Sequence, residues 1–557
     1  LGEAWEASGR GDPEVVATHY EAAGQTDRAA HFASLAAVRA EDVLAFDRAA
    51  RLYRWVIDLG VHAPDEQRRL WTKLGDALAN AGRGDQAALA FLAAAARSPA
   101  DEAADLERRA AEQLLRIGKI DEGLAVLRTV LGRVGLKIAA TPASALLSIA
   151  AHRALIGLRG LTFRERPADD VPPAILRRLD ACWTAAVGLS MVDTIRGTEF
   201  QQRNLLLALR AGEPRRAALA LAMQIPNTSF GGGARRLART ERLGQTVMAL
   251  AERMDHPRAL GFATVNVGIA YRLHGRYRES FEQIERGAAI LRDRCTGVSW
   301  ELESAQIMLM ENLLWLGRWD EMFQRLPAFL QEADARGDVY GATYAGVRIL
   351  PMQWLARDRP DEGRDEARGA IGRWSAQGFH LQHYNALFAQ VDADLYAGDG
   401  AAGLDRLARS ARDLRRSMLM RLQAVRIEFL FLRARAAIIA ALKGETRFLR
   451  GATADAERLE RTRAPWAQAL ACLVRAGAAS IGGDPRNAAA RLADAETRLA
   501  ASDLSHLATA SRRRRGEIVG GSEGYALVED ADRWFSDQQV TNPDRMARLL
   551  APGARSR

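Results

Sequence analysis

Cysteine is scarce and long apolar runs are missing from this 557-residue sequence. Its three cysteines, Cys182, Cys295 and Cys472, are far apart and no CxxC pair occurs, which excludes a disulfide framework and is typical of a reducing compartment. Nowhere do about 18 apolar residues follow one another, so we expect no membrane span. No signal peptide is visible either, and we expect a cytoplasmic protein. Because the first residue is Leu1 rather than Met, we expect the chain to be part of something longer.

Lysine and aromatic residues are also rare. Aromatic residues make up 6% of the chain, and of its 78 basic residues 74 are arginines, the lysines being Lys73, Lys119, Lys137 and Lys443. The net charge of +9 could mark a surface for nucleic acid or for an acidic partner. Most arginines, however, alternate with Asp and Glu at helical spacings, which predicts a solvated helix face. Alanine and leucine are abundant and favour helices.

Motifs for catalysis or cofactor binding are missing as well. The sequence contains no Walker A pattern and no HExxH zinc motif, and its spacing supports no Ser/His/Asp or Cys/His arrangement. We therefore expect a non-enzymatic chain with no cofactor and no metal.

Three short stretches could nevertheless carry chemistry. The glycine-rich segment 231–236 could hold a phosphate at a helix N-terminus or simply connect two helices. His380 and His383, three residues apart on a predicted helix, could bind zinc or take part in packing or recognition. The run Arg512–Arg515 could contact nucleic acid, but its charge also suits the end of a helix predicted over 486–515. In each case we favour the interpretation without a ligand.

A recurring turn is the main positive feature of the sequence. A helical run ends at glycine, which adopts the left-handed conformation readily, and an acidic residue then begins the next helix at its positive end. The turn glycines are Gly24, Gly82, Gly118, Gly212, Gly275, Gly317, Gly398 and Gly482, and Arg359–Glu362 is expected to act in the same way without glycine. From Gly275 onward the turn positions 275, 317, 358, 398, 444 and 482 lie 38 to 46 residues apart. Such a period indicates a solenoid of helix pairs, which can exceed the size of a single core.

Two units of this repeat resemble the tetratricopeptide pattern. In the first, small residues let the two helices approach, large residues fill the seam and a proline ends the second helix. Its matching residues are Trp71, Leu74, Gly75, Leu78, Gly82, Ala87, Phe91, Ala94 and Pro99. The second unit matches through Gly268, Tyr271, Gly275, Tyr277, Ser280 and Ile284. We predict an all-α, tetratricopeptide-like superhelical repeat array.

The turns are missing between Gly118 and Gly212 and between Gly212 and Gly275. The first gap holds a helix that starts at Pro142 and a linker, 164–173, which cannot be helical at its proline pair. The second gap holds a flexible loop at 229–236. We place a boundary near residue 165 and divide the chain into an N-terminal sub-array (1–165), a central array (166–445) and C-terminal repeats with capping helices (446–557).

Several strings distributed over the whole chain share a further similarity. They are Gly11–Gly24, Ala45–Arg54, Arg294–Leu302, Gly378–Tyr384, Gly516–Gly524, Ala531–Trp534 and Asn542–Gly553. They resemble the repeat region that follows the ATPase module of large bacterial serine/threonine protein kinases. The resemblance implies an upstream kinase domain and an AAA-type signal-transduction ATPase, to which ATP and magnesium would belong. None of the kinase signatures is present in this sequence, so no catalytic residue carries over.

We therefore predict a sensor or docking scaffold that binds a protein or peptide in a concave groove and regulates the upstream modules by intramolecular contact. Neither a membrane nor a nucleic acid is expected as a partner. The residues predicted to contact the partner are Trp374, Phe379, His380, His383 and Tyr384. The alternative is the repeat region of an ATP-dependent transcription regulator, which would need a C-terminal helix-turn-helix. Residues 516–557 are too short, and too acidic around 529–532, to supply one.

Overall fold

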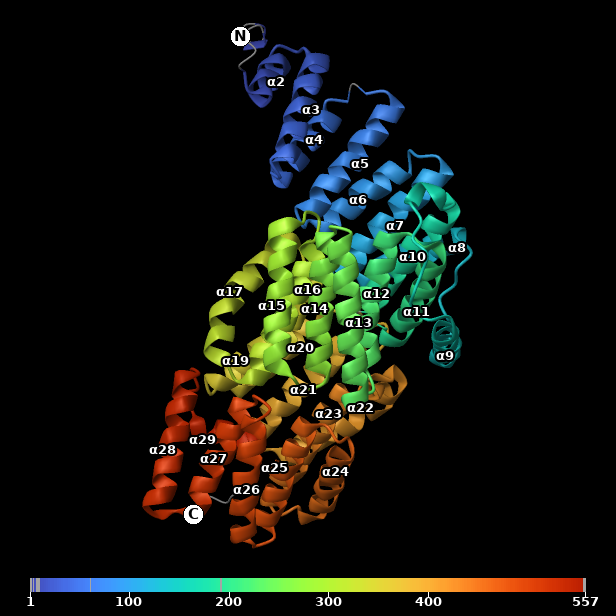
Figure 1. Cartoon of the computed structure of the whole chain (residues 1–557). Coiled ribbons are helices and arrows are strands. Elements are labelled where there is room, and N and C mark those ends of the chain that lie inside the picture. Colours follow the sequence, from blue (N-terminus) through green and yellow to red (C-terminus); the bar gives the residue numbers. More distant parts are fainter. Residues whose placement is uncertain (1–2, 4, 7–10, 61, 191–192, 554–557) are drawn as a thin grey trace.

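Alanine- and leucine-rich segments fold into helices, and each helix packs mainly against the next one along the chain, as the computed structural model in Figure 1 shows. The structure describes residues 3, 5–6, 11–60, 62–190 and 193–553, and these ranges contain no β-strand. The predicted all-α, tetratricopeptide-like solenoid is confirmed. Among the described residues, no helix combines the length and the apolar character that crossing a membrane requires.

The helices divide by position in the chain. The N-terminal helices are α2 (Pro13–Ala22), α3 (Thr26–Asp42), α4 (Phe46–Asp58), α5 (Pro64–Asn80), α6 (Gly84–Ala95), α7 (Ala100–Arg116) and α8 (Ile120–Arg133). The middle helices are α9 (Pro142–Arg159), α10 (Pro173–Ser190), α11 (Thr194–Ala211), α12 (Pro214–Ser229), α13 (Ala234–Arg253), α14 (Pro257–Leu273), α15 (Tyr277–Arg294), α16 (Ser299–Leu316) and α17 (Trp319–Arg336). The C-terminal helices are α18 (Val339–Tyr344), α19 (Leu350–Ala356), α20 (Pro360–Gly372), α21 (Leu381–Tyr396), α22 (Gly400–Ser417), α23 (Gln423–Leu442), α24 (Leu449–Arg461), α25 (Pro465–Ile481), α26 (Pro485–Ala500), α27 (Ser505–Val519), α28 (Gly521–Asp537) and α29 (Pro543–Leu550).

The left-handed turns predicted from the glycines are confirmed. The φ angles of the turn glycines from Gly24 to Gly398 lie between 72° and 85°, and Asp358 takes the same role with a φ of 60°. Near residue 482 the left-handed residue is Gly483, because Gly482 still has a helical φ of −69°. Local turn chemistry is therefore sufficient to locate these helix ends.

Other turns are built without glycine, and no sequence pattern predicted them. Positive φ angles also occur at Leu44, Asp255, Met418, Arg463, Asp503 and Gln539. The helix predicted over 486–515 is wrong for this reason, since α26 ends at Ala500 and α27 begins at Ser505, on either side of Asp503. The left-handed conformation is disfavoured for most side chains with a Cβ, and Asp enters it more readily than Leu, Met or Arg.

The two gaps in the repeat also contain helix pairs. Thr141 caps α9 and Pro142 is its first residue, as predicted. The linker 164–173 is not α-helical before Pro173 and holds a short 3₁₀ turn, Ala168–Asp170. The segment 230–233 joins α12 to α13.

Close helix approach at small residues is confirmed in both tetratricopeptide-like units. A Cβ on Gly75 would lie 2.4 Å from the ring of Phe91, and a Cβ on Gly268 would lie 2.5 Å from Ile284. Any side chain at either glycine would push the paired helices apart.

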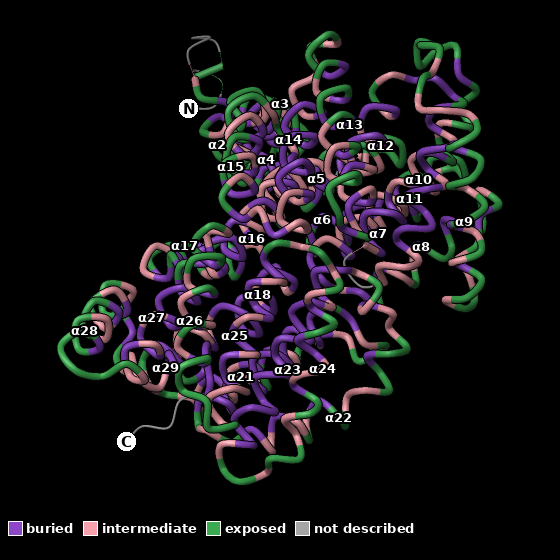
Figure 2. Tube along the Cα trace, turned by 60° about the horizontal axis from the view of Figure 1, so that its bottom comes forward, coloured by how far each residue is buried: buried purple, intermediate pink, exposed green. Residues whose placement is uncertain are grey.

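The superhelix winds back onto itself, so that helices far apart in sequence touch. The backbone N–H groups of Val339 and Tyr340 donate to Ile117 O at 2.9 and 3.2 Å. Thr541 N donates to Ala356 O at 2.7 Å, and the turn at Gly275 lies directly against the indole of Trp466. Figure 2 shows buried segments running through the middle of the molecule and exposed segments at its periphery.

The apolar core reflects this winding. One cluster of buried residues extends from Ala111 to Ala551, while a separate cluster, Ala17–Leu114, holds the first helix pairs together. A third cluster, Ile156–Trp300, lies under the middle helices. The division of the chain near residues 165 and 445 stays a prediction.

One helix of the C-terminal half contains a π-helical turn. Residues 339–356 form a continuous helix in which α18 and α19 are joined by the π turn Ala345–Ile349. Pro351 lies just after this turn, and a proline ring has no N–H and clashes with the carbonyl one α-helical turn earlier. The wider turn accommodates the proline and places Arg348 in the interior, where it is 7% exposed.

Candidate binding site

Buried ion pairs connect α14, α16, the π turn and α23 in the interior of the molecule. Arg348 Nε lies 3.0 Å from Glu311 and Arg348 Nη2 lies 3.7 Å from Glu428, while Arg272 Nη2 lies 3.0 Å from the other Glu311 oxygen. Burial would raise the pKa of Glu311, but Arg348 and Arg272 lower it to about 2. Burial raises the pKa of Glu428 despite the same two arginines. Two arginines and two glutamates therefore form a compact, charge-balanced group.

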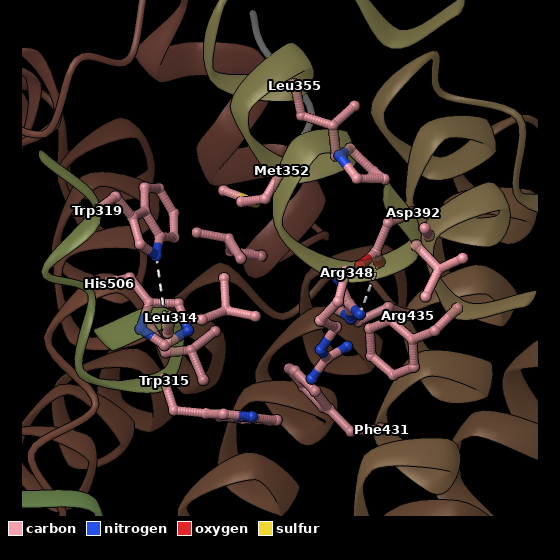
Figure 3. Close-up of a pocket in the computed structure, with 16 residues that line it drawn as sticks. Leu314, Trp315, Trp319, Arg348, Met352, Leu355, Asp392, Phe431, Arg435 and His506 are labelled. Atoms are coloured by element: carbon pink, nitrogen blue, oxygen red, sulfur yellow. Dashed lines mark hydrogen bonds and ion pairs between the residues drawn. The ribbon is translucent and has the colours of Figure 1, made fainter. Parts of the chain in front are cut away.

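A small cavity of about 80 Å³ lies beside this group (Figure 3). Trp315, Trp319 and His506 line one side of it, and the ion pair between Arg435 and Asp392, with a 2.9 Å contact, lines the other. Burial lowers the pKa of His506 to about 3, and Arg435 lowers it further. The cavity is well below the roughly 300–1,000 Å³ of ligand pockets, so it cannot hold a peptide.

A larger cavity of about 450 Å³, which we call the arginine pocket, opens between α7, α10, α11, α12 and the start of α14. Its charged and polar lining consists of Arg108, Arg109, Glu112, Gln113, Arg116, Asp180, Asn204, Arg215, Arg216, His256 and Arg258. Phe91, Leu179, Trp183 and Leu219 supply apolar surface, and Gly297 completes the wall. Six arginines thus face two carboxylates in a space large enough for a ligand.

The arginines are held in place by partners on several helices. Arg216 makes a bidentate contact with Asp180 at 2.7 and 2.8 Å, and Arg258 contacts Glu301 at 2.6 and 2.9 Å. Arg108 contacts Glu112 at 2.9 Å. Burial would raise the pKa of Glu112, but Arg116, Arg108 and Arg258 together lower it to about 2. Arg109 pairs with Asp76 and Arg116 pairs with Glu112, so five of the six guanidinium groups are fixed before any ligand arrives.

Three polar groups of the pocket keep hydrogen-bonding capacity. Arg215 is exposed and its guanidinium makes no ion pair within the described ranges. Asn204 is 3% exposed, and its side-chain amide has no hydrogen-bond partner among the described residues. His256 Nδ1 accepts from Ala259 N at 3.1 Å, so the neutral ring carries its proton on Nε2 and can donate it. Burial lowers the pKa of His256, and Arg215 and Arg258 lower it further, which keeps the ring neutral.

The sequence missed this site. Arg108, Glu112 and Arg116 lie four residues apart and so share one face of α7, a spacing that we interpreted as a solvated face. In the structure their side chains are only 11 to 16% exposed. Their burial arises because α10 packs against α7 and α14 places Arg258 in the wall of the same cavity.

The residues predicted to contact a partner cluster at the start of α21, and most of them are buried. Trp374, His380 and Tyr384 are 2 to 7% exposed, and Trp374 Nε1 bonds to His380 Nδ1 at 2.9 Å. His380 N donates to His383 Nδ1 at 3.1 Å, and the rings of His383 and Phe379 stack. Burial lowers the pKa of His383 to about 4, and His380 lowers it further. Phe379 and His383 remain half-buried, so a role for this cluster in partner binding stays a prediction.

The other sequence candidates take part in internal contacts. A Cβ on Gly232 would overlap Gln423, whose N–H donates to Phe230 O at 3.1 Å, so the segment 231–236 packs against α23. Arg513 contacts Asp532 at 2.6 Å and Asp544 at 3.0 Å. Within the described ranges no group of three or more His, Cys, Asp or Glu side chains is arranged to hold a metal ion.

Comparisons with known proteins return distant structural similarities. Neither a protein-family pattern nor a curated protein matches the chain. Among solved structures, similar chains include a Rap protein complexed with competence and sporulation factor (10% identity, covering 79% of this chain and 100% of that one, TM-score 0.40). Yeast Tom70 has 12% identity over 94% and 99% of the two chains, with a TM-score of 0.31. Naa15, in a complex of Naa15/Naa10 bound to HypK-THB, has 12% identity over 96% of each chain, with a TM-score of 0.24. From its own helix pairs and turns, the chain is a tetratricopeptide-like helical repeat solenoid.

Proposed function

We propose that the chain is a non-catalytic scaffold that binds an acidic segment of another protein in the arginine pocket. The observation that carries the proposal is the gathering of six arginines, with the unpaired Arg215 and the buried Asn204, around one cavity of about 450 Å³. Guanidinium groups pair with carboxylates in a bidentate manner, so Asp or Glu side chains are the natural ligands.

The positions of two arginines support an anionic ligand. Arg215 and Arg258 lie in the first turns of α12 and α14, where the helix dipole disfavours positive charge by about 0.3–1 kcal/mol each. A bound carboxylate would reverse this penalty, because it would interact favourably with both the guanidinium groups and the helix termini.

The polar and apolar parts of the pocket suit a peptide. An asparagine amide can donate to one peptide group and accept from another, and Asn204 is available for both. Trp183 and Leu219 offer apolar surface beside the charges. Asn204 lines the cavity, so a ligand that displaces solvent there must pair the Asn204 amide or lose affinity, which adds specificity.

The test is a binding titration with a fluorescent peptide rich in Asp and Glu, compared with the same peptide carrying Asn and Gln. We expect the acidic peptide to bind more tightly and to weaken as salt is added. Arg215→Ala should raise its Kd about tenfold, since a charge-assisted hydrogen bond contributes about 1.5–3 kcal/mol.

Arg450 provides the matched control. It is exposed on α24, far from the pocket in sequence, and it makes no ion pair within the described part of the chain. Arg450→Ala removes the same charge and should leave the Kd unchanged. Equal binding of both peptides, or equal affinity of the Arg215→Ala and Arg450→Ala variants, contradicts the proposal.

A regulatory role is proposed on the resemblance of the strings described above. They are similar to the repeat region of bacterial serine/threonine kinases with a fused ATPase, and occupancy of the arginine pocket would bias such modules in the cytoplasm. In the parent protein, the acidic peptide should change the rate of ATP hydrolysis, and Arg215→Ala should abolish the change. If saturating peptide leaves the ATPase rate unchanged, the regulatory role is contradicted while binding still stands.

A further inference from the structure

Helix α9 presents an apolar face to solvent. Leu147, Leu155 and Leu158 are 74%, 45% and 88% exposed, and Ala151 and Ala154 beside them are also exposed. At about 100° per residue these five residues fall on one side of the helix, which we call the α9 stripe. The opposite side packs through Ala145, Ile149 and Ile156, all buried. Leucines on a free helix face are costly in water, so the stripe needs an occupant.

The place of α9 in the fold leaves the stripe uncovered. α9 packs mainly against α11, whereas most helices of the solenoid have a neighbour on each side. It lies at the margin of the molecule in Figures 1 and 2, on a convex edge. A convex, protruding helix fits a flat surface better than it fits a groove.

Charge identifies the kind of surface. The chain contains 69 acidic residues, yet none occurs between Glu122 and Glu165. This 42-residue segment carries the basic residues Arg128, Arg133, Lys137, Arg153, Arg159 and Arg164. Of these, Arg128, Lys137, Arg153 and Arg164 are exposed, and their side chains make no ion pair within the described ranges. The segment is therefore strongly positive and has no acid of its own to neutralise it.

We propose that α9 attaches the chain to a bilayer surface rich in anionic headgroups, lying in the plane of the interface with the stripe in the acyl boundary. Arg153 is exposed on the side of α9 between the packed face and the stripe, where a long basic side chain can reach headgroups while leucines enter the apolar layer. The segment offers charge of one sign only, which suits an anionic bilayer surface. The expectation of no membrane partner rested on spanning segments, and an interfacial helix does not span.

The segment after α9 lines a cavity with basic side chains and one acid, Glu165, which pairs with Arg253. Leu161 and Phe163 line a cavity of about 600 Å³ together with the side chains of Arg239 and Arg242 from α13. Both arginines are exposed and make no ion pair within the described residues. An apolar depression beside unpaired arginines suits a lipid, with its acyl chain in the cavity and its phosphate at the guanidinium groups.

The experiment is co-sedimentation of the full chain with vesicles of equal parts phosphatidylglycerol and phosphatidylcholine, compared with vesicles of phosphatidylcholine alone. We expect binding to the anionic vesicles that falls as salt is added. The double variant Leu147→Glu/Leu158→Glu should bind at least about tenfold more weakly, because it removes two leucines and adds two negative charges. Arg153→Gln should weaken binding about fivefold.

Leu89→Glu is the matched control, since Leu89 is 62% exposed on α6, outside the acid-free segment. It should bind vesicles as the wild type does, and circular dichroism should show that all variants fold, since the substituted side chains are solvent-exposed. The proposal is overturned if the wild type does not bind anionic vesicles, or if the double variant binds them with the affinity of the wild type. It is also overturned if the wild type is a dimer that the double variant dissociates, because the stripe is then a contact between copies. Arg215→Ala should leave vesicle binding intact, so this test and the peptide titration fail independently.

Discussion

Replacing Arg348 by methionine should destabilise the protein strongly at neutral pH. The Arg348 side chain is 6% exposed, contacts Glu311 and Glu428, and lies 4.9 Å from the ring of Phe388. Methionine keeps most of the side-chain volume and an apolar contact with the ring, but it leaves two buried carboxylates with Arg272 alone. Removal of one partner from a buried ion pair costs about 3–5 kcal/mol, because the remaining charge stays desolvated.

The assay is urea denaturation followed by circular dichroism, for Arg348→Met, Glu428→Gln and the double variant. The double variant keeps the pair between Arg272 and Glu311, so we expect it to recover about 2 kcal/mol or more relative to the sum of the single changes. In Arg348→Met the pKa of Glu428 rises further, so the folded state binds a proton more readily than the unfolded state. The loss should therefore be larger at pH 7 than at pH 5. A loss below about 1 kcal/mol, or one independent of both pH and Glu428, would refute the reasoning.

Two further predictions concern turn strain and pH. Leu44 is 58% exposed with a φ of 60°, so Leu44→Gly should raise the free energy of unfolding by about 1 kcal/mol in urea melts. Gly24 has a φ of 72° and open space around a Cβ, so Gly24→Ala should lower the free energy of unfolding by a similar amount. If both changes are neutral, the left-handed conformation stores no strain. Burial, assisted by Arg435, lowers the pKa of His506 to about 3 in the folded protein. As the pH falls below about 6.5, the ordinary pKa of histidine, the unfolded state therefore binds the proton first and the folded state loses stability. This group alone should cost about 2 kcal/mol between pH 7 and pH 5, and His506→Gln should flatten the pH dependence by that amount; an unchanged slope would mean that the ring is already protonated when folded.

Most of the fold followed from local chemistry in the sequence. Glycine turns such as Gly212 and Gly317 could be placed because the left-handed conformation is a property of one residue and its neighbours. Turns at Leu44 and Met418 could not, since neither residue favours that conformation. The break at Asp503 was missed although Asp enters the left-handed region more readily than most residues with a side chain.

The candidate site was largely hidden from the sequence for a different reason. The face that Arg108 and Arg116 share on α7 is visible in the spacing, but its burial depends on helices about 70 to 150 residues away. At α21, by contrast, the sequence pattern was visible but the structure does not form the expected helix face. The spacing of His380 and His383 indicated one exposed helix face, whereas His380 stands just before the helix and bonds back to the residues around it. The first outcome depends on helices distant in sequence, whereas the second depends on contacts with residues three and six positions away.

The return of the superhelix onto itself changes how the molecule should respond to force. In an open solenoid each repeat touches only its neighbours, so repeats peel away one at a time at similar loads. Here distant repeats are in direct contact. Gly275 packs against Trp466, and Ile117 is hydrogen-bonded to Val339 and Tyr340. Pulled from its two ends, the chain should lose α2–α6 first at low load, because the apolar core that they share with α7 is separate from the main core. The helices from α7 onward, which these long-range contacts connect, should then unfold together in one event and extend by most of their contour length.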